Sequence, residues 1–179
     1  MKASLWFLGL CVMLAGCGNS SPQNSPDNQA ENKDKKLTIA MIPKGTTHEF
    51  WKSVEAGARK AANELGGEII WKGPLKEDNK DDQIKTVEDF INRKVNGICL
   101  APLDQSALRS PVTAAQAAGI PVLIFDSALK DVDTVSFVAC YNHVAGMLGG
   151  MRLGELLGGK GKVLLLRYQE GSASTTEDR

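Results

Sequence analysis

The sequence has no charge imbalance and little histidine, and each shortage excludes a class of function. Its 179 residues carry 21 Lys and Arg against 21 Asp and Glu, so the formal net charge is +0. A nucleic-acid-binding domain usually displays a basic stripe, whereas the one Lys-rich run here, at 33–36, is interrupted by Asp34. The two histidines and four cysteines have no spacing typical of a metal site. We therefore expect no nucleic-acid partner, no metal and no cofactor.

The short motifs of common enzymes are also missing. There is no Walker loop and no Gly-x-Gly-x-x-Gly, and the stretch Gly-Ser-Ala-Ser at 171–174 lacks the second glycine of a nucleophile elbow. No nucleophile is paired with a base, so we predict that the protein is not an enzyme. A helix-turn-helix is absent too, which argues against a DNA-binding repressor.

No apolar run in the sequence is long enough to cross a membrane. The longest one near the N-terminus, at 5–14, follows Lys2 and has about half the length that a spanning helix needs, which is typical of a signal-peptide core. Directly after it, Leu14-Ala15-Gly16-Cys17 resembles the bacterial lipobox, at which the signal peptide is cleaved and the cysteine receives lipid. We expect residues 1–17 to be a signal peptide, Cys17 to be the lipid attachment site, and the protein to lie in the cell envelope or periplasm, anchored to a bacterial membrane.

Residues 18–36 contain almost nothing apolar and are rich in Asn, Ser, Pro, Gln and charge. Such a composition cannot bury a core, so we expect a disordered tether there. A flexible chain of that length has an r.m.s. reach of roughly 25 Å, enough to hold a domain off a membrane surface. The folded domain is expected at 37–179.

Two cysteines remain for this domain, because Cys11 belongs to the signal peptide and Cys17 would carry lipid. Both of them, Cys99 and Cys140, lie in apolar, strand-like runs. A disulfide is possible in an oxidising envelope, and two buried free thiols on neighbouring strands are equally compatible with the pattern.

From residue 37 onward, apolar runs of strand length alternate with helical patterns. Strands are expected at 37–42, 68–71, 97–101, 121–125, 135–140 and 162–166, and helices at 48–66, from 76–82 to 95, at 110–118 and at 142–157. This order predicts an α/β fold, a mainly parallel doubly wound sheet with helices on both faces. Residues 174–179 have the composition of a helix start without a body, so we expect a truncated product.

Polar turns follow the expected strands at 44–48, 101–105, 126–127, 141–142 and 169–176. Because the carboxyl ends of parallel strands lie at one edge of a sheet, these turns should form a single cleft. Asp126 directly follows a buried strand, where its carboxylate could accept hydrogen bonds from ligand hydroxyls. As an alternative, it is simply a turn residue.

Two adjacent aromatics, Phe50 and Trp51, open the first helix. The helical period turns one of them toward the core, and the other could stack on the apolar face of a sugar ring unless both are core residues. His48 precedes them, either as a helix-start residue or as a hydrogen-bonding group for a ligand.

These features in this order resemble the ribose-binding-protein-like family of periplasmic sugar-binding proteins, which have the type I periplasmic binding protein fold shared with LacI-like ligand-binding domains. The resemblance is carried by the lipobox, the polar tether, the segments 37–43, 48–66, 97–104 and 118–122, and Asp126. It implies a two-lobed binder that closes on a sugar and delivers it, as a monomer, to the permease of an ABC importer. Residues 37–179 would then be an incomplete N-terminal lobe, with the second lobe absent.

The resemblance also implies a set of ligand-binding residues. The expected set is His48, Phe50, Trp51, Asp126, Ser127, Asn142 and Arg179, with Asp178 competing with Arg179 for the position of the family's last-loop arginine. Two positions depart from the ribose pattern, since Ala101 stands where Asn is frequent and Ser127 where Arg is frequent, so another sugar or a small polyol is expected. A sensing lipoprotein that reports such a solute to a membrane signalling partner is the alternative to import.

Overall fold

The computed structural model describes residues 36–168 and 170–176. The expected signal peptide, lipid-bearing Cys17 and tether up to residue 35 lie outside this part of the chain, and so does Arg179. Within the described residues, no helix combines the length and the apolar character that crossing a bilayer requires.

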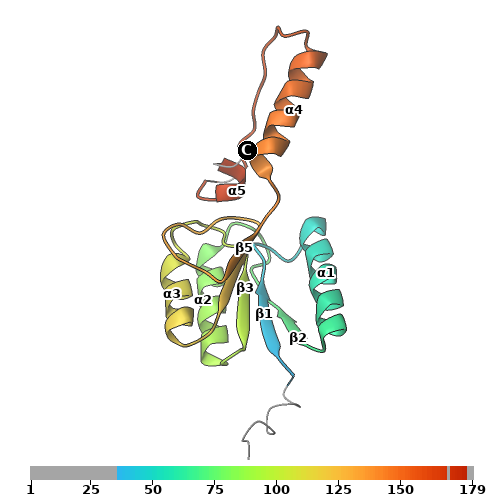
Figure 1. Cartoon of the computed structure of the whole chain (residues 1–179). Helices are drawn as coiled ribbons and strands as arrows, with labels where there is room; N and C mark the ends of the chain where they lie inside the picture. The colour runs from blue at the N-terminus through green and yellow to red at the C-terminus, as the bar shows by residue number, and fades with distance from the viewer. Residues whose placement is uncertain (1–35, 169, 177–179) are drawn as a thin grey trace, which may run out of the picture. The chain divides into compact units, whose positions relative to one another are not determined.

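Five parallel strands form one sheet in the order β2-β1-β3-β4-β5. The elements along the chain are β1 (Thr38–Ile42), α1 (Glu49–Leu65), β2 (Glu68–Trp71), α2 (Lys80–Asn92), β3 (Gly97–Leu100), α3 (Arg109–Ala117), β4 (Val122–Phe125), β5 (Ser136–Val138), α4 (Asn142–Leu156) and α5 (Ala173–Thr176). Helix α1 lies on one side of the sheet and α2 and α3 lie on the other (Figure 1). The expected α/β fold class is confirmed.

The core lies between the sheet and helices α2 and α3. Alternate strand residues point into it, which is why burial follows a period of two along β1, β3 and β4. Its members are Ala40, Ile42, Val87, Phe90, Val95, Ile98, Leu100, Leu108, Val112, Ala115, Ile120, Val122 and Ile124. Burying each large apolar side chain of this kind stabilises the fold by about 1.5–3 kcal/mol.

Helix α1 begins and ends at residues that the sequence marks for those places. His48 is its N-cap, and the His48 Nδ1 atom accepts a hydrogen bond from the backbone N–H of Phe50 at 3.2 Å. At the other end Gly66 adopts a left-handed φ of 70°, and its N–H donates to the carbonyl of Ala62. The helix therefore presents residues 50 and 51 at its first turn, beside the carboxyl end of the sheet.

The strand expected at 162–166 does not form. These residues have no regular structure, and Val163, Leu164, Leu165 and Leu166 are 59–88% exposed. A strand is stable only when a neighbour pairs with its backbone N–H and C=O groups, and none of the described residues pairs with this run. Helix α4 shows the same lack of cover, since Met147, Leu148 and Met151 are at least half exposed.

Cys99 and Cys140 are both free thiols. Cys99 lies on β3 and Cys140 beyond the end of β5, and β4 separates these two strands. The expectation of two buried thiols on neighbouring strands is therefore wrong, because Cys140 is exposed. Burial raises the pKa of the Cys99 thiol, which keeps it protonated and unreactive.

Candidate functional site

Three turns of the chain meet at the carboxyl edge of the sheet around the side chain of Lys44. Lys44 follows β1, Asp126 and Ser127 follow β4, and the third turn, at 171–176, leads into α5. The turn at 101–105 joins them, since the Gln105 N–H donates to the carbonyl of Gly171 at 3.0 Å. The predicted convergence of these polar turns thus occurs in the structure.

Lys44 is the charged centre of this cluster and is only 3% exposed. Its ammonium lies 2.8 Å from Asp126 Oδ2 and donates to the hydroxyls of Ser172 and Ser174 at 3.0 Å, and also to that of Ser127. A buried ammonium is tolerated only when a counter-charge and hydrogen-bond acceptors replace water. These oxygen atoms meet that requirement.

Asp126 combines an unusual backbone with a shared carboxylate. Its φ is 63°, a left-handed value that Asp adopts more readily than most residues, and its N–H donates to the carbonyl of Val138 at 2.9 Å. Within residues 36–168 and 170–176, the contacts of the carboxylate with Lys44 and Ser127 both end on Oδ2. With the side chain 19% exposed, Oδ1 remains able to accept a hydrogen bond from a ligand.

The other polar residues of the predicted set are less open. Ser127 is buried, with its hydroxyl 2.7 Å from that of Ser174. Asn142 is also buried, as the first residue of α4. The Ser127 hydroxyl is thus engaged inside the protein, and the backbone N–H of Asn142 donates to the carbonyl of Cys140 at 2.9 Å.

The sequence predicts that one of Phe50 and Trp51 faces the core and leaves open which of them it is; in the structure Trp51 is the core residue and Phe50 is exposed. Trp51 is 1% exposed, its indole N–H donates to Glu77 Oε1 at 2.6 Å, and its ring lies edge-on 6.3 Å from that of Phe125. Phe50 is 49% exposed and meets Trp51 edge-on at 4.9 Å. Phe50 thus has an aromatic ring exposed to solvent. The buried ring of Trp51 packs against it and also contacts Phe125, the residue before Asp126.

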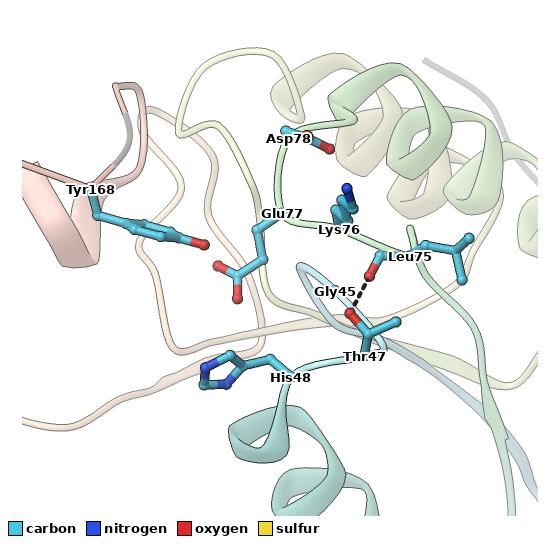
Figure 2. A pocket seen from close by; sticks show the side chains of 8 residues that line it. All are labelled: Gly45, Thr47, His48, Leu75, Lys76, Glu77, Asp78 and Tyr168. Atoms are coloured by element: carbon cyan, nitrogen blue, oxygen red, sulfur yellow. Dashed lines mark hydrogen bonds between the residues drawn. The ribbon is translucent and has the colours of Figure 1, made fainter.

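A groove of about 460 Å³ opens beside this aromatic pair. It is lined by Gly45, Thr47, His48, Leu75, Lys76, Glu77, Asp78 and Tyr168. Figure 2 shows the Tyr168 hydroxyl pointing toward the carboxylate of Glu77, with the imidazole of His48 below them. Burial together with the charges of Glu77 and Asp78 raises the pKa of Tyr168, so its phenol stays neutral and able to donate. Because His48 Nδ1 accepts from the backbone, Nε2 is the imidazole atom left for a ligand.

Gln83, which the sequence reading missed, holds two of the site's turns in place. It is fully buried, and its amide donates to the carbonyls of Pro43 at 3.0 Å and Ala101 at 2.8 Å while accepting from the N–H of Leu103 at 2.9 Å. A polar residue on the face of α2 that carries Val87 and Phe90 was the available signal. The backbone carbonyl of Ala101, which stands where Asn is frequent in the ribose pattern, thereby accepts a hydrogen bond inside the protein.

Asp104 performs a similar task in the turn after β3. Its Oδ1 accepts from the N–H groups of Ser106 and Ala107, both at 2.8 Å. Burial acts to raise the pKa of this carboxyl, but the hydrogen bonds from Ala107 and Ser106 and the charge of Lys80 outweigh it and hold the pKa below its usual range.

Among the described residues no group of His, Cys, Asp and Glu is arranged to hold a metal ion.

Comparison with known proteins gives relatives over most of the chain. The sequence profile of the family described as periplasmic binding protein domain matches residues 39–179. The ribose import binding protein RbsB of Bacillus subtilis (strain 168) is 28% identical over 165 residues, which are 92% of this chain and 53% of RbsB. The resemblance to ribose-binding-like proteins is thus confirmed.

Solved structures give the same result. An ABC transporter solute binding protein from Agrobacterium vitis with bound D-fucose is 37% identical, with a TM-score of 0.75 over 77% of this chain and 49% of that one. Another from the same organism, bound with alpha-D-tagatopyranose, is 30% identical, with a TM-score of 0.74 over 80% and 51% of the two chains.

The chain spans about half the length of the curated relatives it matches. The family match begins within β1 and includes the turns that surround Lys44. This chain belongs to the periplasmic binding protein domain family.

Proposed function

We propose that this chain forms one wall of a sugar-binding cleft in a substrate-binding lipoprotein of an ABC importer. The observation that carries the proposal is the exposed ring of Phe50, linked through Trp51 and Phe125 to the partly exposed carboxylate of Asp126. An aromatic face suits the C–H face of a sugar ring, and a carboxylate suits its hydroxyls. His48 lines the groove on the same side and adds a polar atom at Nε2.

The ligand class is a neutral monosaccharide or a related polyol. Relatives are named for binding ribose, D-apiose and xylitol, and solved neighbours hold D-fucose and tagatopyranose. Ribose itself is not favoured over the others, because Ala101 and Ser127 depart from the ribose pattern and are both occupied inside the protein.

The remaining parts of the proposal concern the whole protein. Cys17 would carry the lipid that anchors it in the cell envelope, and a monomer would deliver its sugar to permease subunits. Asn142 and Arg179 stay in the proposed ligand-binding set beside Ser127. No chemical step is proposed, and the names of the relatives favour import over sensing.

A thermal-shift screen with D-fucose, D-ribose, tagatose and xylitol tests this proposal. Binding to the folded state raises the melting temperature, because it stabilises that state by RT ln(1 + [L]/Kd), where [L] is the ligand concentration. At least one of these compounds is expected to raise the melting temperature of the wild type, and the shift should be smaller in Phe50→Ala. The matched control is Phe137→Ala, which removes an exposed aromatic on β5 and should show the same ligand-induced shift as the wild type. If none of the compounds shifts the wild type, the sugar assignment fails.

A further inference from the structure

Helix α4 carries glycines at a regular spacing of four residues, at Gly146, Gly150 and Gly154. Residues four apart lie on one side of a helix, so these three form a stripe without side chains. Such a stripe lets a second backbone approach closely, which offsets the helix stability that glycine costs. In the structure, a Cβ atom added at Gly150 or Gly154 would meet no atom within 4 Å. No described segment therefore makes the close approach that these two positions allow.

The stripe lies among exposed apolar side chains. Six large ones of α4 and its C-cap are 40–67% exposed, namely Met147, Leu148, Met151, Leu153, Leu156 and Leu157. A groove of about 370 Å³ is lined by Gly150 and Gly154 on the helix and by Val163 on the chain that follows it. No other helix or strand of the described residues packs extensively against α4.

This apolar surface is large enough for a stable interface. The exposed residues 163–166 add to it, since Val163 lines the groove beside the stripe. At roughly 100 Å² for each half-exposed side chain of this size, the whole surface is on the order of 1,000 Å². Monomers rarely expose an apolar patch above a few hundred Å², and a stable complex buries about 800 Å² on each partner.

The occupant that fits this surface is a second copy of α4. Adjacent residues differ by about 100° around a helix axis, which places Arg152 on the side opposite Gly150. The Arg152 guanidinium is paired there with Glu155 at 3.0 Å. Two stripes can therefore meet without opposing like charges. A lipid surface fits less well, because binding to it depends on buried apolar side chains and gains nothing from a stripe that has none.

We propose that α4 is the interface of a homodimer, in which the glycine stripes of two copies pack antiparallel and cross near Gly150. Helix α4 begins four residues after β5, at the carboxyl edge of the sheet, so parallel copies would bring both sheets to the same end. The antiparallel arrangement also separates the two Lys160 side chains that line the grooves. Met147 of one copy then lies beside Met151 of the other. The inference is independent of the proposed function and goes beyond it, since it concerns this 179-residue chain by itself, whereas the proposed monomer is the whole transport protein.

Sedimentation equilibrium of the full 179-residue chain tests this interface. The wild type should show a monomer–dimer equilibrium, and Gly150→Leu should raise the dissociation constant about tenfold or more, because a side chain in the stripe keeps the helices apart. The matched control is Gly57→Leu, the same substitution at an exposed glycine inside α1, which should leave the dissociation constant unchanged. Leucine favours a helix over glycine, so both variants should keep their helices.

Three results would overturn the inference. One is a wild type that stays monomeric at every concentration, and another is a Gly150→Leu variant that associates like the wild type. The third is a wild type that is monomeric in solution and sediments only with vesicles of phosphatidylcholine and phosphatidylglycerol, which would assign the face to a lipid surface.

Isotope-filtered NMR on the wild type gives a readout that needs no variant. One half of the protein carries ¹³C-labelled methionine methyl groups and the other half is unlabelled, so only contacts between copies are recorded. A cross-peak between labelled Met147 and unlabelled Met151 is expected. A mixture that gives no such cross-peak, or gives cross-peaks only from Met41 of β1, would contradict the proposed interface.

Discussion

At the scale of single residues, the Lys44–Asp126 pair is the feature with the largest expected energetic effect. Lys44 is almost completely buried and Asp126 is partly exposed, so removing one of these charges should not destabilise the protein as much as removing the other. Removing the carboxylate leaves an uncompensated charge inside the protein, whereas removing the ammonium leaves a carboxylate that water can reach.

We therefore predict that Asp126→Asn lowers the free energy of unfolding by about 3 kcal/mol, and that Lys44→Met lowers it by less. Urea denaturation followed by circular dichroism measures both values. The control is Asp89→Asn on α2, whose carboxylate makes an exposed pair with Lys72, so that its loss should leave the free energy of unfolding nearly unchanged. An Asp126 variant as stable as the control would show that the pair does not hold the cluster.

Gly171 is required by its surroundings as well as by its backbone. Its φ is 82°, and a Cβ atom there would lie 2.6 Å from Asp104 Oδ2. Gly171→Ala should therefore cost roughly 1–3 kcal/mol of stability. Gly57→Ala is the matched control, because Gly57 lies inside α1 with no atom within 4 Å of an added Cβ, and alanine should stabilise the helix by about 1 kcal/mol. The same denaturation measurement applies, and changes of equal sign in both variants would contradict this reading.

The division of labour between Phe50 and Trp51 shows what periodicity leaves open. Adjacent helical residues differ by about 100° around the axis, so the pattern shows that one ring faces the core without showing which. The choice depends on Phe125 and Glu77, which contact Trp51 from β4 and from the turn before α2. Such long-range partners are not visible in a local pattern.

At the scale of elements, the sequence predicts the helices and strands and their order correctly wherever a neighbouring element packs against them or pairs with them. Helix α1 stops before Gly66, its C-cap, because the left-handed φ of this glycine cannot continue the helix. The apolar runs of β1, β3 and β4 pair in one sheet. The run at 162–166 has the same composition and remains irregular, because nothing in the described part of the chain pairs with it. Strand propensity therefore predicts a strand only where another strand is available to pair with it.

Hydrogen exchange tests this contrast between elements. The amides of residues 162–168 should exchange within the dead time of a manual experiment, whereas those of β1 and β3 should be protected by their ladder and by burial. The comparison is made by mass spectrometry on peptides from one digest. Protection of 162–168 equal to that of β3 would mean that the run is a paired strand after all.

The turn after β3 has a pH dependence of known sign. Because the pKa of Asp104 is lowered in the folded state from its ordinary value of 3.8, its stabilising contribution is fully present above that value and is lost as the pH falls through the lower folded pKa. In Asp104→Asn the unfolding free energy should therefore decrease less steeply below about pH 4 than in the wild type. Unfolding curves across the acid range measure this, and parallel pH profiles would contradict it.

At the scale of the whole molecule, the candidate site was partly predictable. The carboxyl edge of the sheet, with the turns after β1 and β4, follows from the parallel topology alone. The Lys44 cluster does not, because its hydroxyl partners lie 83, 128 and 130 residues away along the chain. Gln83 was missed for a related reason, since its three backbone partners come together only after β1 and β3 have paired.

Under the proposed function this chain forms one wall of the cleft, so it would cover a ligand at the carboxyl edge from one side. Much of the sugar's surface would then stay in water, so we expect an affinity in the millimolar range, or about −4 kcal/mol, for the chain by itself. Isothermal calorimetry that gave a micromolar Kd would contradict this expectation.

The central claim is that a sugar binds at the carboxyl edge of the sheet, and amide chemical-shift mapping with the sugar that gives the largest thermal shift tests it most directly. The account predicts saturable shifts at residues 44–51 and 126–127, and none around the opposite-edge pocket formed by Asn92, Asn96 and Gly119. Shifts at that pocket, or no saturable shift at the carboxyl edge, would contradict it.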